Sequence, residues 1–133
     1  MSSAITHAGV VRRASPHSVA ETAARLESLL AERGVLVFAR IDFAADAARA
    51  GLSMRPEQLL IFGNPRAGTA LMQTEPVAGL DLPLKALIFE DGDGRTWIAW
   101  NDPQYVIDRH GLPAALTANL AAVVPLIERA VQP

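Results

Sequence analysis

The sequence predicts an α+β protein in which helices back a single antiparallel sheet. Apolar runs such as Leu59–Phe62 are typical of buried strands. The pairs Asn64-Pro65 and Asp102-Pro103 are typical helix starts, because the first residue caps the helix and proline suits its first turn. Between these pairs, Asp91-Gly92-Asp93-Gly94 indicates a hairpin turn. Strands, hairpin and capped helices together define this fold class.

Length and composition indicate one packed domain. The chain has 133 residues, and a chain of that size buries about two thirds of the surface that its unfolded form exposes. Hydrophobic residues make up 50% of the sequence and charged residues 20%, a balance that favours a core over disorder. No internal repeat or low-complexity linker divides the chain. We therefore expect one domain over 15–133, preceded by a partly ordered segment at 1–14.

Charge and cysteine content argue against several classes of function. The formal net charge is -2 and no basic cluster is longer than Arg12-Arg13, so the footprint of a nucleic-acid-binding protein is missing. The chain has no cysteine, which excludes disulfides, thiolate nucleophiles and iron–sulfur clusters. No apolar stretch approaches the roughly 20 residues of a membrane span, and residues 1–13 lack the apolar run of a secretory signal. We expect a soluble, cytoplasmic protein with no membrane or nucleic-acid partner.

The first half of the chain predicts two helices and three strands. Ser18 and Glu21 form a capping box, and the apolar residues that follow at helical spacing predict a helix over 19–33. Gly34 suits the left-handed residue that ends such a helix, and Asp42 caps a second, short helix. The other elements expected in this half are strands at 9–12, 35–41 and 59–62 and a helix at 43–50.

The second half predicts helices after Asn64 and Asp102, with a pair of strands between them. The expected segments are a helix at 65–73, a loop at 76–83, strands at 84–90 and 95–100, and a helix at 103–110. The final helix begins near Ala114. Pro125 lies inside it and should kink or break it, because the proline nitrogen carries no hydrogen-bond donor.

Four blocks of sequence together resemble a known family. They are Gly-Val-Leu-Val-Phe-Ala-Arg-Ile-Asp at 34–42, Leu-Ile-Phe-Gly-Asn-Pro-Arg-Ala-Gly-Thr at 60–69, Leu-Pro-Leu-Lys-Ala-Leu-Ile-Phe-Glu-Asp at 82–91 and Trp-Ile-Ala-Trp-Asn-Asp-Pro-Gln-Tyr at 97–105. Their order resembles the DUF302 family, a domain of unknown function, over residues 15–112. The resemblance implies a fold like that of the TATA-binding protein, a helix-backed antiparallel sheet of β-α-β(4)-α type. This chain is expected to add short helices to it.

The resemblance also implies a homodimer, since members of the family tend to form dimers. It does not imply DNA binding, which the charge balance of this chain opposes independently. Many members place a histidine directly after the Ile-Asp pair, where this chain has Phe43. If that histidine holds a ligand or a metal elsewhere in the family, this chain has lost it.

Polar residues at the expected helix starts and strand ends define a candidate ligand site. Free amides at a helix start favour an anion, so Asn64 and Asp102 could frame a pocket; alternatively, they only cap their helices. Lys85, expected on an apolar strand face, could act as a base or an imine-forming amine, or could extend its ammonium group to water. The residues expected to bind the ligand are Asn64, Arg66, Lys85, Trp100, Asp102 and Tyr105.

Two further groups have simple structural explanations. Glu90, Asp91 and Asp93 could suggest a metal site, but a hairpin turn explains their spacing, so we expect no metal and no cofactor. His110 falls in the last turn of a helix, where positive charge is favourable.

The sequence also predicts where its tryptophans and two of its methionines lie. Trp97 and Trp100 should point to opposite faces of their strand, with one tryptophan under a helix and the other free for a ligand or a dimer partner. Met54 and Met72 are expected to fill gaps in the core.

We interpret the chain as a homodimeric binding module for a small molecule or a protein partner. No nucleophile–base pair is recognisable in the sequence, which favours binding over catalysis. One alternative is an enzyme of unknown reaction that uses Lys85 or Asp102 as an acid or base in the same cleft. Another is a structural subunit of an assembly, which would present a large apolar dimer face and a shallow, empty cleft.

Overall fold

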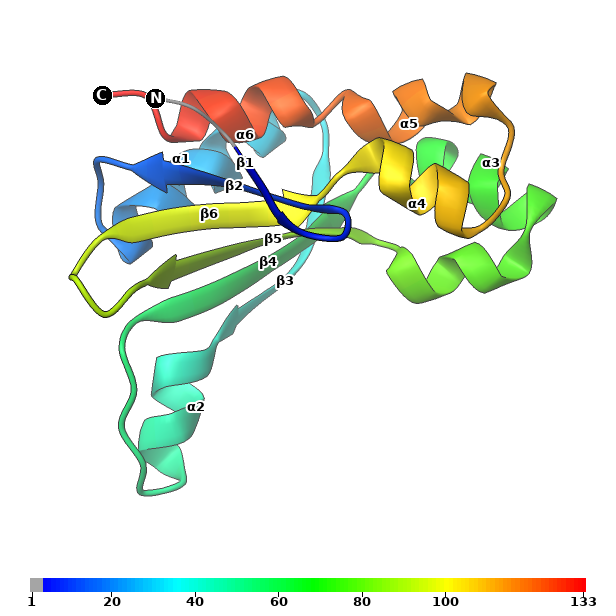
Figure 1. Cartoon of the computed structure of the whole chain (residues 1–133). Helices are drawn as coiled ribbons and strands as arrows, with labels where there is room; N and C mark the ends of the chain where they lie inside the picture. Colours follow the sequence, from blue (N-terminus) through cyan, green and yellow to red (C-terminus); the bar gives the residue numbers. More distant parts are fainter. Residues whose placement is uncertain (1–3) are drawn as a thin grey trace.

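The computed structural model describes residues 4–133 and shows one six-stranded antiparallel sheet (Figure 1). The order of strands across the sheet is β1-β2-β6-β5-β4-β3, and every neighbouring pair is antiparallel. The strands are β1 (Ala4–His7), β2 (Val10–Ser15), β3 (Leu36–Asp42), β4 (Glu57–Gly63), β5 (Leu84–Glu90) and β6 (Thr96–Asn101). This architecture confirms the predicted α+β class.

Two helices, α1 (Val19–Glu32) and α6 (Val124–Ala130), lie along the same face of the sheet (Figure 1). The backbone N–H of Glu21 donates to Ser18 Oγ over 3.1 Å, so the predicted cap is present at the start of α1. Leu26 and Leu30 belong to the apolar stripe of α1 and are fully buried. This stripe holds α1 against the sheet, because burying one such side chain stabilises the fold by about 1.5–3 kcal/mol.

The main core lies between these helices and the sheet. Alternate residues of the three central strands point into it, as strand geometry requires. They are Leu60, Phe62, Ala86, Ile88, Ile98 and Trp100, all of them buried. Trp100 therefore packs under the helices, and Trp97, three residues earlier, faces the other side of the sheet.

A second, smaller core lies beyond one end of the sheet, among five other short helices. Those helices are α3 (Pro65–Thr74), η1 (Pro76–Asp81), α4 (Pro103–Arg109), η2 (Ala114–Leu116) and α5 (Thr117–Ala121). Its buried residues are Leu71, Ala78, Val106, Ile107, Leu112 and Leu120. The Asp81 carboxylate fixes α4 to η1, because it accepts hydrogen bonds from Arg109 Nη1 at 3.0 Å and His110 Nε2 at 2.5 Å. His110 is the C-cap residue of α4, and its side chain connects that helix end to η1 through Asp81.

Two expectations need correction. The segment expected to be a loop at 76–83 contains the 3₁₀ helix η1, whose first amide is capped by Glu75. Met54 and Met72 are 44% and 39% exposed, so neither fills the core. The break expected in the final helix is present: the segment is divided into η2, α5 and α6, and Pro125 stands in the first turn of α6, where its missing donor costs nothing.

Helix α2 (Phe43–Arg49) stands apart from both cores. It connects β3 to β4 and projects away from the sheet on the side opposite α1 and α6 (Figure 1). Asp42 caps it as predicted, accepting from the backbone N–H of Ala45 over 2.9 Å. No residue of α2 is buried.

Candidate functional site

A large cleft opens where β4 ends and β5 begins. The end of β4 and the first turns of α3 form one wall, and α5 and the start of α6 form another. The segment Leu82–Leu84, which contains the cis peptide bond before Pro83, contributes a third side. The cleft has a volume of about 870 Å³. The ends of strands and helices therefore surround a space large enough for a small organic molecule.

Apolar side chains supply most of the cleft lining. Its apolar residues include Val35, Phe38, Met72, Leu82, Leu84, Val123 and Leu126. Phe38 is 51% exposed, although it is a large aromatic residue. It stands at the irregularity between Val37 and Ala39, where β3 departs from regular pairing with β4. An irregularity of this kind changes the direction of a side chain, and here Phe38 joins the cleft.

The charged residues that line the cleft are both arginines. Arg33 is the C-cap residue of α1, and Arg66 lies in the first turn of α3. None of the described residues that line the cleft is a carboxylate, and neither guanidinium forms an ion pair within residues 4–133. Asn119 fixes the wall, because its side-chain amide donates to the Ala67 carbonyl over 3.2 Å. The cleft therefore combines apolar walls with two positive charges that have no ion-pair partner in the described part of the chain.

The start of α3 contributes side chains and not free amides. Asn64 Oδ1 accepts from the backbone N–H of Arg66 over 3.0 Å, and Pro65 has no N–H. The N–H groups of Ala67 and Gly68 both donate to the Asn64 carbonyl. These N–H groups are therefore not free to bind a ligand. Asn64 lines the cleft as a helix cap, and an anion would have to bind to the arginine side chains.

Lys85 and Trp100 lie beside a different and far smaller hollow, and neither lines the large cleft. That hollow measures about 20 Å³, room for about one water molecule. Lys85 Nζ donates to the carbonyl oxygen of Pro83 over 3.0 Å, which holds the ammonium group at the beginning of β5. Of the six residues predicted for one site, the structure places only Asn64 and Arg66 in the large cleft.

Asp102 and Tyr105 contact the N-terminal hairpin instead of the cleft. Asp102 Oδ1 accepts from the backbone N–H of Gln104, and the Asp102 N–H donates to the Gly9 carbonyl over 2.7 Å. The Tyr105 ring packs directly on Gly9: a Cβ at that glycine would lie 2.1 Å from Tyr105 Cγ. These two residues attach α4 to the turn between β1 and β2.

The acidic hairpin is an ordered turn whose carboxylate is fully used. Asp91 Oδ1 accepts from the backbone N–H groups of Asp93 and Arg95, and Asp91 Oδ2 accepts from Trp97 Nε1 over 2.8 Å. The hydrogen bond from Trp97, followed by those of the backbone amides, lowers the pKa of Asp91 below its ordinary value. Among residues 4–133, no group of three or more His, Cys, Asp or Glu is placed to hold a metal ion.

The fold and the cleft together define a class: an α+β domain with one sheet, helices on one face and an organic-molecule-sized hollow at the end of the sheet. The chain belongs to the family described as "Domain of unknown function DUF302", whose model matches residues 11–131. It is similar in structure to the "uncharacterized conserved protein DUF302 from Bacillus stearothermophilus", a crystal structure with a TM-score of 0.76 and 20% identity. That similarity covers 94% of this chain and 97% of the other.

The chain is also similar in sequence to longer proteins. It is 44% identical over 120 residues to the "Fluoride-specific ion channel FluC 1" of Brucella suis and to the "Fluoride-specific ion channel FluC 2" of Brucella melitensis. The match covers 90% of this chain but only 47% and 44% of those proteins, so the chain spans about half the length of the relatives. Within the described part of this chain, none of the helices has the length and apolarity needed to cross a bilayer.

Proposed function

We propose that this chain is a binding module for a small organic anion with an apolar body, and that the large cleft holds this ligand. The observation that carries the proposal is the lining itself: apolar walls with Arg33 and Arg66 and, among the described lining residues, no carboxylate. Guanidinium groups bind carboxylates and phosphates through paired hydrogen bonds. The apolar walls would cover the rest of the molecule.

The size of the cleft supports an organic ligand over a small ion. Pockets that bind drug-sized molecules measure about 300–1,000 Å³, and this cleft measures about 870 Å³. A bare halide ion would leave nearly all of that volume unfilled and would place apolar walls around a charge. An organic body would instead cover Phe38 and Met72, which are now exposed.

The chemistry of the lining supports binding over catalysis. Proton transfer requires a group that titrates near neutral pH, such as histidine, or a tuned carboxylate or lysine. The described lining offers the hydroxyl of Thr69, the amides of Asn64 and Asn119 and two guanidinium groups, which stay protonated. The alternative enzyme would use Lys85 or Asp102, and these residues lie outside the cleft.

The similarity to the fluoride channels suggests where such a module could act. A channel needs backbone segments that satisfy their own hydrogen bonds across the bilayer, and this chain matches less than half of each channel's length. We place the matching segment of those channels outside their conducting part. There, an anion-binding domain of this kind would respond to a cellular ligand.

The proposal is tested with 8-anilinonaphthalene-1-sulfonate, a fluorescent probe that has an aromatic body and one anionic group. We expect the purified chain to bind it and expect the double variant Arg33→Ala/Arg66→Ala to bind it about 100-fold more weakly, since each charge-assisted hydrogen bond contributes roughly 1.5–3 kcal/mol. The charge-matched control, Arg49→Ala/Arg55→Ala, removes two exposed arginines that lie outside the lining and should keep the wild-type affinity.

A second pair of variants tests the position of the ligand. Ala118 is exposed and lines the cleft, so Ala118→Trp should narrow it and weaken probe binding without unfolding the protein. Ala114, which is also exposed but lies outside the lining, provides the matched control Ala114→Trp. Equal probe affinity in all four proteins and the wild type would refute the cleft as the binding site. If the variants instead place the probe in the cleft, organic carboxylates that displace it will identify the chemistry of the ligand.

A further inference from the structure

The aromatic ring of Phe38 is exposed at an edge of the sheet. The order of strands places β3 at that edge, so in the described part of the chain β3 pairs with β4 alone. Phe38 is the residue that the pairing register skips, between Val37 and Ala39. Its side chain is 51% exposed, and it lines the cleft. About half of the surface of a large aromatic residue is therefore free to contact a ligand.

Gly63 and Pro83 lie directly beside the Phe38 ring. A Cβ at Gly63 would lie 3.5 Å from Phe38 Cε2 and 3.7 Å from Pro83 Cβ, which is ordinary van der Waals contact. Gly63 is buried, whereas Phe38 and Pro83 are exposed. The last residue of β4 is thus flanked by two exposed rings, which come from different segments of the cleft wall. Packing beside Gly63 explains the covered part of the Phe38 ring and leaves the exposed part without a structural role in the described chain.

We propose that the ligand of the cleft is a planar aromatic anion and that Phe38 selects it over an aliphatic anion of the same size. This inference rests on the proposed function, because it names the class of molecule that the same cleft binds. Two aromatic rings attract each other in offset or edge-to-face arrangements, beyond the effect of the apolar area that they bury. That attraction corresponds to about 2- to 12-fold in affinity, and an aliphatic body cannot supply it.

The two arginines of the cleft suit an aromatic anion better than lysines would. A guanidinium group is planar, binds a carboxylate through two parallel hydrogen bonds and stacks on aromatic faces, whereas an ammonium group is a compact, strongly hydrated charge. Arg33 and Arg66 line the cleft, and its described lining contains no lysine. An aromatic acid could therefore use both the charge and the flat face of a guanidinium group, whereas an aliphatic acid would use only the charge.

Met72 adds a further group that favours an aromatic body. Its side chain lines the cleft and is 39% exposed. The Met72 sulfur lies beside Gly79, because a Cβ at that glycine would be 3.5 Å from Met72 Sδ. Thioether sulfurs make favourable contacts with the edges of aromatic rings. Aromatic, thioether and guanidinium groups thus line one cleft, and each of them can contact an aromatic ring favourably.

Two acids that share one bicyclic carbon skeleton and carry one carboxylate each test the inference. They are 2-naphthoate, which is planar and aromatic, and trans-decahydro-2-naphthoate, which is saturated and puckered. The affinity of the purified chain for each acid is measured by isothermal titration calorimetry. Burial of apolar area alone favours the saturated acid, because its additional C–H groups give it the larger apolar surface. We expect the wild-type chain to bind 2-naphthoate more tightly, so the direction of the preference separates ring stacking from simple burial.

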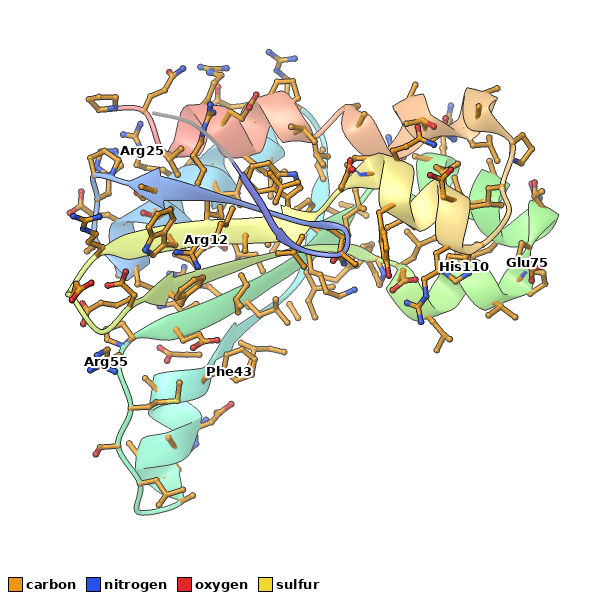
Figure 2. The ribbon with its side chains drawn as sticks, viewed as in Figure 1. Arg12, Arg25, Phe43, Arg55, Glu75 and His110 are labelled. Atoms are coloured by element: carbon orange, nitrogen blue, oxygen red, sulfur yellow. The ribbon has the colours of Figure 1, made fainter. Side chains whose placement is uncertain are left out.

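Variants of Phe38 test whether its ring is the source of the preference. Phe38→Leu replaces the ring with an aliphatic side chain and should lower the preference for 2-naphthoate by about 2- to 12-fold. Phe38→Tyr keeps a ring and should keep the preference. The matched control is Phe43→Leu, the same substitution at the start of helix α2, outside the cleft lining (Figure 2). This control should have the wild-type ratio of the two affinities, and circular dichroism verifies that each variant is folded.

The outcomes separate this inference from the proposed function. If both acids bind and Arg33→Ala/Arg66→Ala weakens both, a wild-type preference for the saturated acid would overturn the inference and leave the proposed function in place. An unchanged ratio of affinities in Phe38→Leu, or a lowered ratio in Phe43→Leu, would do the same. If neither acid binds, the inference is wrong, and the fluorescent probe decides the proposed function: binding of the probe that the double arginine variant weakens supports that function, and no binding refutes it.

Discussion

Replacing Gly9 with alanine tests whether Tyr105 and the N-terminal hairpin form one structural unit. Gly9 has a φ of +74°, a left-handed backbone conformation that residues other than glycine rarely adopt. Its α-carbon faces the Tyr105 ring so closely that a Cβ would lie 2.1 Å from Cγ and 2.3 Å from Cδ2. Because Cγ is close to the backbone of α4, the ring cannot yield by rotating only its tip.

Two costs add in the Gly9→Ala variant. The left-handed backbone costs an alanine about 1 kcal/mol, and overpacking against the ring costs about 1–3 kcal/mol more. We therefore expect the free energy of unfolding to fall by about 2–4 kcal/mol. Tyr105→Ala should cost less, about 1–2 kcal/mol, since the Tyr105 side chain is 38% exposed.

The assay is a double-mutant cycle measured by urea denaturation. The Gly9→Ala/Tyr105→Ala variant removes the clash but keeps the strained backbone, so its loss should be smaller than the sum of the single losses by about 1–3 kcal/mol. Strict additivity, or a cost of Gly9→Ala below about 0.5 kcal/mol, would refute the packing of Tyr105 on Gly9. It would also reopen the original prediction that Tyr105 binds a ligand.

Two further predictions concern stability. Phe62→Ala should lower the free energy of unfolding by about 3–5 kcal/mol, because Phe62 is fully buried between the sheet and the helices; a loss below about 1 kcal/mol would contradict this core. For Asp91, the folded state lowers the pKa below the ordinary 3.8, so the carboxylate stabilises the fold above that pH and its contribution disappears as the pH falls through the folded value. Asp91→Asn should therefore lower the melting temperature at pH 7, and the difference from wild type should shrink in acid; a constant difference across the titration would contradict the assignment.

Local signals in the sequence predicted most of the elements. The capping residues Ser18, Asn64 and Asp102 each begin the helix that the sequence assigns to them, and each accepts a backbone N–H hydrogen bond. The predicted hairpin turn at 91–94 is also present between β5 and β6, because a turn of this kind depends on only a few neighbouring residues. The continuous apolar run in β4 indicated a strand covered on both faces, and this chain's own helices cover one of them. The second subunit stays a prediction, as does the cytoplasmic location.

The full lining of the cleft could not be predicted from the sequence, because its residues come from segments that are far apart along the chain. Arg33 follows α1, Phe38 lies at an irregularity in β3, and Asn119 belongs to α5. No local pattern marks an arginine after a helix as part of a site, and a strand irregularity leaves no clear signal in one sequence. The predicted set combined strand and helix ends by their chemistry, and it therefore included Lys85 and Asp102, which lie elsewhere.

The measurement that tests the central claim most directly is an ¹H–¹⁵N correlation spectrum of the wild-type chain titrated with 8-anilinonaphthalene-1-sulfonate. If the cleft binds organic anions, the largest shifts will come from amides on its walls, such as those of Gly63, Gly68 and Asn119, and the Arg33→Ala/Arg66→Ala variant will lose them. Shifts centred on Leu87 and Trp97, which lie on the face of the sheet opposite α1 and α6 (Figure 1), or an unchanged response in the variant, would contradict the assignment of the cleft as the ligand site.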